Sequence, residues 1–271
     1  MPITTASFDS AFWPDDVTGA IALACVTGAP FARSLTPRPT SKGHVSFPRA
    51  NPSGFGWVGE GQPLPAVALG DDADVIAVAK LAGLITFSNE SLDDPDEPVG
   101  DLLSAAVADA MGPELDAGLL FGAGGVEPDG CFSLAPEAIG GADFRADVIG
   151  AWAELVDAGA DPSSVVAFAS ASVIGYELAR TTTDGVPIHA DGAEAMVGPG
   201  VRMIAVPSLS AGQTLVADVS RLFLVVRNDF EAKFSDQAAF ANDQALCRIK
   251  GRFAVACPQP AKTLRKITAA S

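Results

Sequence analysis

The strongest constraint on the fold is an apolar repeat with a four-residue period between residues 98 and 121. The repeat positions are Val99, Leu103, Val107, Met111, Leu115 and Leu119, with Leu102, Ala106 and Ala110 beside them. This spacing gathers apolar side chains on one face and predicts a long amphipathic helix that needs a packing partner. Acids in residues 94–98 lie where the helix dipole favours negative charge. The small residues 122–125 predict the end of the helix.

One dipeptide conflicts with a straight helix in this segment. Gly112 and Pro113 fall inside the repeat. A proline in a helix interior removes a backbone hydrogen bond and costs about 3 kcal/mol. The sequence therefore predicts either two helical pieces or one bent helix.

The rest of the chain alternates between short helices and strands. Helices are predicted at 147–158 and 170–180, and a short one at about 17–26 that Asp15 or Asp16 caps. The predicted strands are 45–47, 74–80, 81–87, 164–168, 201–206, 214–218, 222–226, 231–234 and 245–256. In this interpretation, residues 45–80 form a long two-stranded hairpin with a mobile, polar tip. The class is α+β, and 271 residues suit one large domain or two small ones.

Charge is distributed unevenly along the chain. There are 33 acids and 17 bases, which gives a net charge of −16. Residues 60–135 contain 15 acids and a single base, Lys80, whereas six bases and no acid follow Asp243. Broad binding to duplex nucleic acid needs clustered Lys and Arg, so the net charge argues against it. The apolar content of 48 % excludes a disordered chain.

The sequence predicts a soluble protein made in the cytoplasm. The longest uncharged run, residues 17–32, contains 16 residues and follows no basic segment. A membrane helix needs about 20 apolar residues, and a signal peptide needs basic residues ahead of its core. Cys25, Cys131, Cys247 and Cys257 form no C-x-x-C motif, and two histidines cannot complete a zinc site with them. Buried thiols in a reducing compartment are expected.

The remaining motifs predict no catalytic, cofactor or metal site. Residues 54–59 match G-x-G-x-x-G, but two prolines just beyond them prevent the helix that a dinucleotide site requires. The acidic clusters at 71–74 and 93–97 lack the ligand spacing of a calcium loop and indicate solvated surface. His189, in a loop beside carboxylates, is expected at the surface rather than as a general base. A metal-dependent hydrolase that uses the acidic clusters is a rival interpretation.

Several short motifs follow one another in a definite order. They are Phe47-Pro48, residues 57–61 (WVGEG), 80–88 (KLAGLITFS), 119–122 (LLFG), 128–131 (PDGC), 185–188 (GVPI) and 248–255 (RIKGRFAV). Together they span about residues 45–262, and their order and separations are more specific than any one of them. With these motifs the sequence resembles the major capsid proteins of tailed phages that have the HK97-type fold.

The resemblance implies an HK97-like capsid fold with a definite division of the chain. The implied parts are an N-terminal arm (1–44), an extended β-hairpin called the E-loop (45–80), a peripheral domain (81–135 and about 222–262, with its spine helix at about 98–121), an axial domain (136–221) and a C-terminal tail (263–271). In this family the E-loop lies over a neighbouring subunit. The proline-rich arm is expected to become ordered in the same way.

The function that the resemblance implies is a major capsid protein and not an enzyme. Its copies would form the hexamers and pentamers of an icosahedral virion shell around double-stranded phage DNA, after assembly in the cytoplasm of the bacterial host. An encapsulin-like compartment of the same fold, with a cargo enzyme inside, is the alternative. Expected partners are further copies, a portal protein and separate scaffolding or decoration proteins, with no cofactor, membrane or sequence-specific DNA contact.

Candidate inter-subunit contacts lie at the hairpin tip and in the basic end of the chain. They are Phe55, Trp57, Glu60, Arg248, Lys250 and Arg252. A two-stranded hairpin cannot bury aromatic rings near its own tip, so those rings indicate a partner surface. The basic residues are expected to meet acidic neighbours rather than phosphate, and an acidic or neutral lining would keep enclosed DNA mobile.

Overall fold

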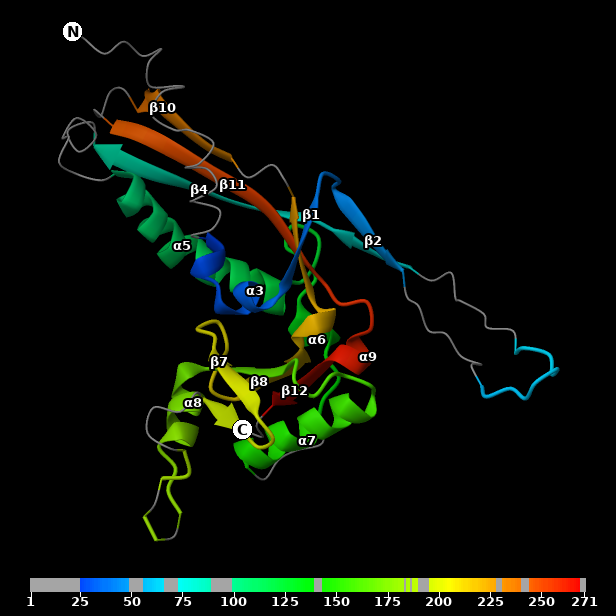
Figure 1. Cartoon of the computed structure of the whole chain (residues 1–271). Coiled ribbons are helices and arrows are strands. Elements are labelled where there is room, and N and C mark those ends of the chain that lie inside the picture. The colour runs from blue at the N-terminus through cyan, green and yellow to red at the C-terminus, as the bar shows by residue number, and fades with distance from the viewer. Residues whose placement is uncertain are drawn as a thin grey trace.

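The chain folds into two packed bodies and a projecting hairpin (Figure 1). The computed structural model describes residues 25–48, 56–65, 73–88, 99–138, 143–182, 184–185, 187–189, 195–227, 231–239 and 244–268. The first body combines a long helix with a five-stranded sheet, and the second combines two helices with another five-stranded sheet. The mixture of helices and strands confirms the α+β class.

The first body is built around its longest strand. Its strands are β1 (Thr36–Thr40), β4 (Ala79–Ser88), β9 (Phe223–Arg227), β10 (Glu231–Ala239) and β11 (Gln244–Ala256). β4 pairs antiparallel with one side of β11, while β10 and then β9 pair antiparallel with the other side. Along β11, Cys247 and Ile249 are buried but Arg248 between them is exposed. One face of the sheet therefore meets the core, and the other meets solvent along residues 246–250 but is covered by the base of the hairpin at Ala254 and Ala256.

Helix α5 (Val99–Phe121) packs against the buried face of this sheet. Val107, Met111, Leu115 and Leu119 are buried, which confirms this part of the predicted apolar face. Two of the flanking positions are a correction: Ala106 and Ala110 are exposed. The buried stripe is completed on its other side instead, by Asp116 and Leu120.

The helix runs unbroken through its proline. Because α5 includes Pro113, the first of the two expected alternatives, two helical pieces, is wrong, and the chain forms one helix here. Met111 and Leu115, on either side of the proline, are both buried in the same core and hold the two halves on one surface. Gly112 has a packing role: a Cβ there would lie 2.4 Å from the carbonyl carbon of Gly28. Tertiary packing thus outweighs one lost backbone hydrogen bond.

Residues 25–40 pack within their own chain. Helix α3 (Pro30–Ser34) lies on α5, and β1 pairs in parallel with β9. The backbone N–H groups of Phe31 and Ala32 each donate a hydrogen bond of 2.9 Å to the buried Asp116 carboxylate of α5. The expectation that the arm becomes ordered only on a neighbour is therefore wrong for residues 25–40. The helix expected at 17–26 lies mostly outside the described residues.

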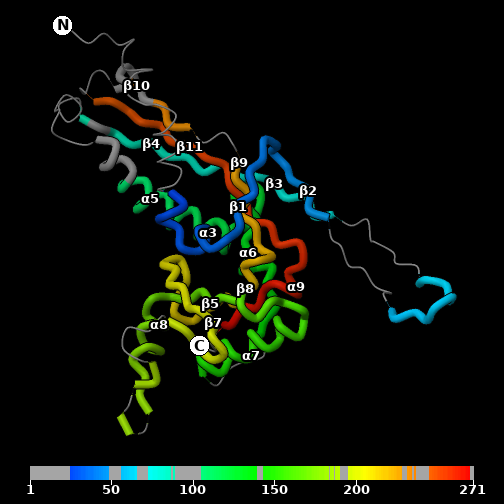
Figure 2. Tube along the Cα trace, viewed as in Figure 1, coloured from blue at the N-terminus to red at the C-terminus, as the bar shows by residue number. Residues whose placement is uncertain are grey.

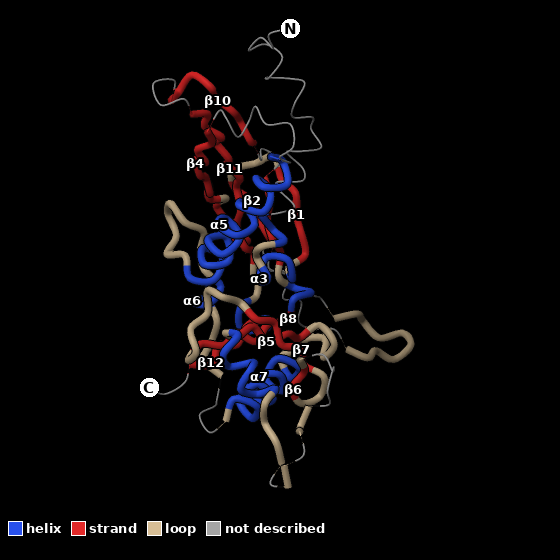
Figure 3. Tube along the Cα trace, turned by 90° about the vertical axis from the view of Figure 1, so that its left-hand side faces the viewer, coloured by secondary structure: helices blue, strands red, loops and turns tan. Residues whose placement is uncertain are grey.

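The second body is a sheet of strand order β12-β8-β5-β7-β6. Its elements are β5 (Val165–Ala169), β6 (Met196–Val197), β7 (Val201–Ala205), β8 (Gln213–Asp218), β12 (Leu264–Thr268), α7 (Phe144–Asp157) and α8 (Ala171–Leu178). α7 lies under β8 and β12 (Figure 3). The two predicted helices and the strands near 164–168, 201–206 and 214–218 are confirmed. The segment expected as a tail instead begins with β12, which pairs antiparallel with β8 and buries Leu264.

The two bodies share one continuous core. The ring of Phe31 in α3 meets that of Phe168 in β5 edge-to-face, with centroids 5.0 Å apart. Short helices α6 (Cys131–Leu134) and α9 (Pro260–Thr263) lie between the bodies (Figure 2). The 3₁₀ turn η1 (Val219–Arg221) connects β8 of the second body directly to β9 of the first. All four cysteines are free and buried, which confirms that expectation.

The hairpin leaves the first body on two paired strands. β2 (His44–Pro48) and β3 (Ala73–Ala77) are antiparallel over five residue pairs, which confirms the predicted strands here. Phe47 anchors the base of the hairpin by stacking on Phe223 at 5.7 Å. No helix within the described part of the chain is long and apolar enough to span a bilayer.

Candidate subunit-contact surfaces

The hairpin tip carries aromatic and apolar side chains that its own chain does not cover. Trp57 is 108 % exposed and Leu64 is 83 % exposed, and Glu60 is exposed between them. This loop, residues 56–65, is drawn in cyan far from both bodies in Figure 1. Phe55, the other aromatic candidate, lies outside the described residues. Burying a large aromatic surface is favourable, so the tip is poised for a partner.

The second group of candidates surrounds one carboxylate on the solvent side of β10 and β11. Glu231 contacts the Lys233 ammonium at 2.7 Å, the Arg248 guanidinium at 3.4 Å and the Lys250 ammonium. Hydrogen bonds from Lys233 and Lys250 hold the pKa of Glu231 at about 2, well below its ordinary value. The expected acidic neighbour of Arg248 and Lys250 is thus, in part, Glu231 of the same chain. The sequence could not show this because the pairing depends on the strand register.

Strand register also gathers further bases on this side of the sheet. Lys233 pairs with Arg248, and Lys80 of β4 pairs with Arg252. Paired residues project to the same face, so five bases share the face that is turned away from α5. We call this surface the basic sheet face; its bases are Lys80, Lys233, Arg248, Lys250 and Arg252. Leu84, 68 % exposed and paired with Arg248, lies among them.

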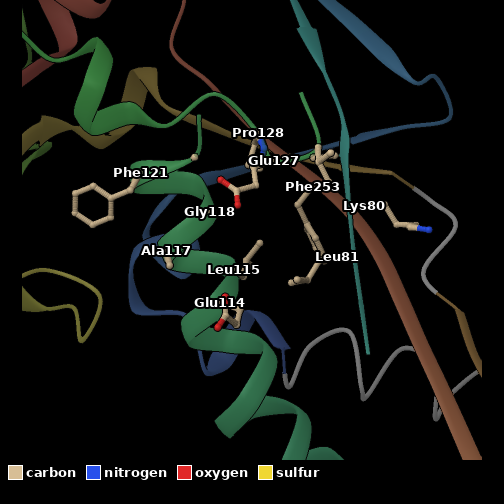
Figure 4. Close-up of a pocket in the computed structure, with 13 residues that line it drawn as sticks. Lys80, Leu81, Glu114, Leu115, Ala117, Gly118, Phe121, Glu127, Pro128 and Phe253 are labelled. Carbon is tan, nitrogen blue, oxygen red and sulfur yellow. The ribbon is translucent and has the colours of Figure 1, made fainter. Parts of the chain in front are cut away.

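A groove of about 350 Å³ lies between α5 and strands β4 and β11 (Figure 4). Glu114 and Glu127 both line it and are exposed. Phe121 and Val126, also in the lining, are 37 % and 88 % exposed. Lys80 belongs to the lining as well, but its side chain points away from α5 in Figure 4. We call this feature the acidic groove after Glu114 and Glu127. No Lys or Arg occurs between residues 81 and 144, which supply most of its lining.

A buried charge cluster holds a loop of the second body in place. Glu177 of α8 contacts Arg145 at 3.1 Å, Arg180 at 3.0 Å and His189 at 3.5 Å. The expectation that His189 is a surface residue is wrong, because its side chain is only 10 % exposed. The loop that follows α8 folds back so that the imidazole faces the Glu177 carboxylate. Two arginines already hold that carboxylate, so the cluster is an internal clamp.

The other motifs behave as structural features where they are described. Residues 56–65 contain no helix after the glycine motif, so the geometry of a dinucleotide site is missing there. α5 ends at Phe121, and Gly124 and Gly125 have φ values near +80°, which confirms residues 122–125 as a helix stop. Among the described residues no cluster of His, Cys, Asp and Glu could hold a metal ion. The acidic cluster at 93–97 lies outside them.

Comparisons with known proteins give the fold its family. The chain is similar to the capsid of a native GTA particle (14 % identity, TM-score 0.67, 100 % of this chain and 95 % of that one). It is similar to a chain of Mycobacterium phage Adephagia (18 % identity, TM-score 0.67, 100 % of this chain and 99 % of that one). It is also similar to a virus-like particle from Pyrococcus furiosus (9 % identity, TM-score 0.60, 93 % of this chain and 98 % of that one). No curated protein matches by sequence.

These structures confirm the predicted HK97-like capsid fold, since the likeness extends over nearly the full length of each chain. The match at the level of sequence is independent of that likeness. The model of the phage capsid family fits residues 13–263, which include both bodies and the hairpin. The chain therefore belongs to the phage capsid family of structural shell proteins.

Proposed function

We propose that this chain is the major capsid protein of a tailed phage and that it forms the hexamers and pentamers of an icosahedral shell around double-stranded DNA. The match to the phage capsid family over residues 13–263 is the observation that carries this proposal. The mechanism is geometric: contacts between unlike faces of identical copies close into rings. No residue is assigned a catalytic role.

Electron microscopy of the purified protein and of its native particle tests this function. We expect closed icosahedral particles whose DNA resists added nuclease until the shell is opened. Only small, discrete species under every salt and crowding condition would contradict the proposal. Such particles belong in the virion, after assembly in the host cytoplasm with a portal and separate scaffolding or decoration proteins.

A compartment that encloses a protein cargo is the second candidate. The likeness to a virus-like particle from Pyrococcus furiosus, which extends over 93 % of this chain, favours it. The contents of native particles separate the two functions: nuclease-resistant DNA supports the capsid, whereas a single co-purifying enzyme without DNA supports the compartment.

We expect Trp57→Ser to reduce assembly at least tenfold without changing the stability of the subunit. The Trp57 side chain is fully exposed, and substitutions of such residues change stability by only about 0.5 kcal/mol. A hairpin tip that docks on a neighbour would, however, lose its largest apolar anchor. The assembled fraction is measured by sedimentation and the subunit melting temperature by circular dichroism. Gln62→Ser, on the same exposed loop, is the control; equal assembly of both variants would contradict the contact.

We expect purified particles to give a single band near 27.5 kDa on denaturing electrophoresis. Some members of the family join subunits through a lysine of the E-loop and an asparagine of another subunit. This chain has no lysine between Lys42 and Lys80, so the hairpin lacks the amine for such a bond. A ladder of covalent multimers that survives boiling in reductant would show this prediction to be wrong.

A further inference from the structure

The first body presents opposite charges on two different surfaces. Among the described residues, the basic sheet face gathers five bases and the Glu231 carboxylate on the side of the sheet turned away from α5. The acidic groove lies on the other side, between α5 and the sheet edge, and has Glu114 and Glu127 at its margin. The two surfaces adjoin along β4, where Lys80 belongs to both, but their other charged side chains lie on opposite sides of the sheet, so we expect each surface to meet a different neighbour.

The two surfaces also match in their apolar parts. Leu84, on the edge strand β4, lies beside Arg248 at the border of the basic sheet face and is 68 % exposed. Phe121 and Val126 are exposed in the lining of the acidic groove. Each surface therefore combines charged with exposed apolar side chains, and in protein interfaces charge sets orientation while apolar burial supplies affinity.

We propose that the basic sheet face of one copy docks on the acidic groove of the next copy in a repeating head-to-tail contact. Leu84 would meet Phe121 and Val126, while Lys233 and Arg248 would approach Glu114 and Glu127. Such a contact joins unlike faces, and its repetition closes a ring when the rotation between successive copies is a whole fraction of a turn. The inference rests on the proposed shell function and assigns to it a contact surface between subunits.

Nucleic acid fits the basic sheet face less well than a protein surface does. The described residues of this face include no aromatic side chain on which a base could stack. An exposed leucine, Leu84, lies at its edge, and the ionised Glu231 carboxylate lies between the bases and would repel phosphate. An apolar residue with a central acid suits a protein partner that is acidic and partly apolar, as the groove is.

Charge reversal on each side tests the contact. The face variant is Lys233→Glu with Arg248→Glu, and the groove variant is Glu114→Lys with Glu127→Lys; all four residues are exposed. Each variant alone is expected to reduce the assembled fraction at least tenfold. The quadruple variant, which carries both reversals in one chain, is expected to recover at least half of the wild-type fraction, because every contact again joins opposite charges.

Matched variants separate this effect from a general effect of charge. Lys42→Glu with Arg202→Glu and Asp157→Lys with Asp184→Lys make the same charge changes at exposed positions elsewhere. They are expected to assemble as the wild type does. Circular dichroism melts of the unassembled variants verify that each is folded, and failure of the quadruple variant to recover assembly while it is folded would overturn the inference.

The remaining outcomes distinguish the inference from the proposed function. If wild-type shells form and the face variant assembles equally well but retains less nuclease-resistant DNA, the face binds nucleic acid and the docking inference is wrong. If the wild type forms no shell, sedimentation velocity of the face and groove variants, mixed in equal amounts, still tests the contact. Association in the mixture but in neither variant alone supports it, and no association in the mixture overturns it.

Discussion

Lowering the pH from 7 to 4 is expected to stabilise the wild-type subunit by about 2 kcal/mol relative to the variant Asp116→Asn. Asp116 is fully buried, and burial raises the pKa of its carboxyl from the ordinary 3.8 to about 6, although hydrogen bonds from Ala32 and Phe31 oppose the rise. A pKa that is higher in the folded state than in the unfolded state makes protonation favour folding. One unit of such a difference corresponds to about 1.4 kcal/mol.

The sign and the pH window follow from the two pKa values. The contribution of Asp116 protonation to the free energy of unfolding is fully present below about pH 3.8, decreases as the pH rises, and is lost above about pH 6. The asparagine side chain of the variant is neutral throughout, so the difference in free energy of unfolding between the two proteins isolates this carboxyl. Urea unfolding of unassembled subunits at half-unit steps of pH measures it.

The matched control lies on the exposed side of the same helix. Asp109→Asn also removes one carboxylate from α5, but from an exposed position. Its difference from the wild type is expected to vary by less than about 0.5 kcal/mol over the same range, as is usual for a surface substitution. If the Asp116→Asn difference is equally flat, the carboxyl of Asp116 titrates as it does in the unfolded chain, and the inference that burial raises its pKa is wrong.

Gly112→Ala is expected to lower the free energy of unfolding by about 2 kcal/mol. The added Cβ would lie 2.4 Å from the carbonyl carbon and 2.5 Å from the carbonyl oxygen of Gly28. Both atoms belong to the backbone, so no side chain can rotate away, and overpacking of this kind costs about 1–3 kcal/mol. The gain of up to about 1 kcal/mol from replacing a helical glycine by alanine offsets the cost only partly.

Gly175→Ala provides the opposite expectation at a comparable helical position. Gly175 lies inside α8, and a Cβ there would meet no atom within 4 Å. Alanine should therefore stabilise the subunit by about 0.5–1 kcal/mol through helix propensity alone. Chemical denaturation of both variants measures the contrast. A stabilised Gly112→Ala subunit would contradict the prediction, because it would show that the Gly28 backbone can move away from the added Cβ without a loss of stability.

Local patterns predicted the elements whose side chains alternate between core and solvent. α5 and β11 were predictable because Leu115 and Ile249 belong to regular periods of apolar residues. β1 was missed because Pro37 and Pro39 argue against a strand, and prolines are tolerated in strands chiefly at a sheet edge such as this one. β12 was missed because Arg265 and Lys266 interrupt its apolar pattern.

Contacts between distant segments could not be derived from these patterns. Glu231 meets Arg248 and Lys250 only because β10 and β11 pair in one particular register. His189 faces Glu177 only because a loop returns to the helix that precedes it. The capsid family and fold were predicted from a resemblance over several motifs, whereas the basic sheet face and the acidic groove became visible only in three dimensions.

Of the three connections between the bodies, from α6 to α7, through η1 and through α9, the last two limit how the subunit can change shape. η1 leads from β8 directly into β9, and α9 leads from β11 directly into β12, so the chain crosses between the sheets twice through short, structured links. The edge-to-face rings of Phe31 and Phe168 join the bodies at their shared core. A hinge between the bodies would have to break that core and bend both links together. The subunit should therefore move as a rigid body, so we expect any enlargement of a shell to come from tilting whole subunits and from bending the hairpins, which we propose lie over neighbouring subunits.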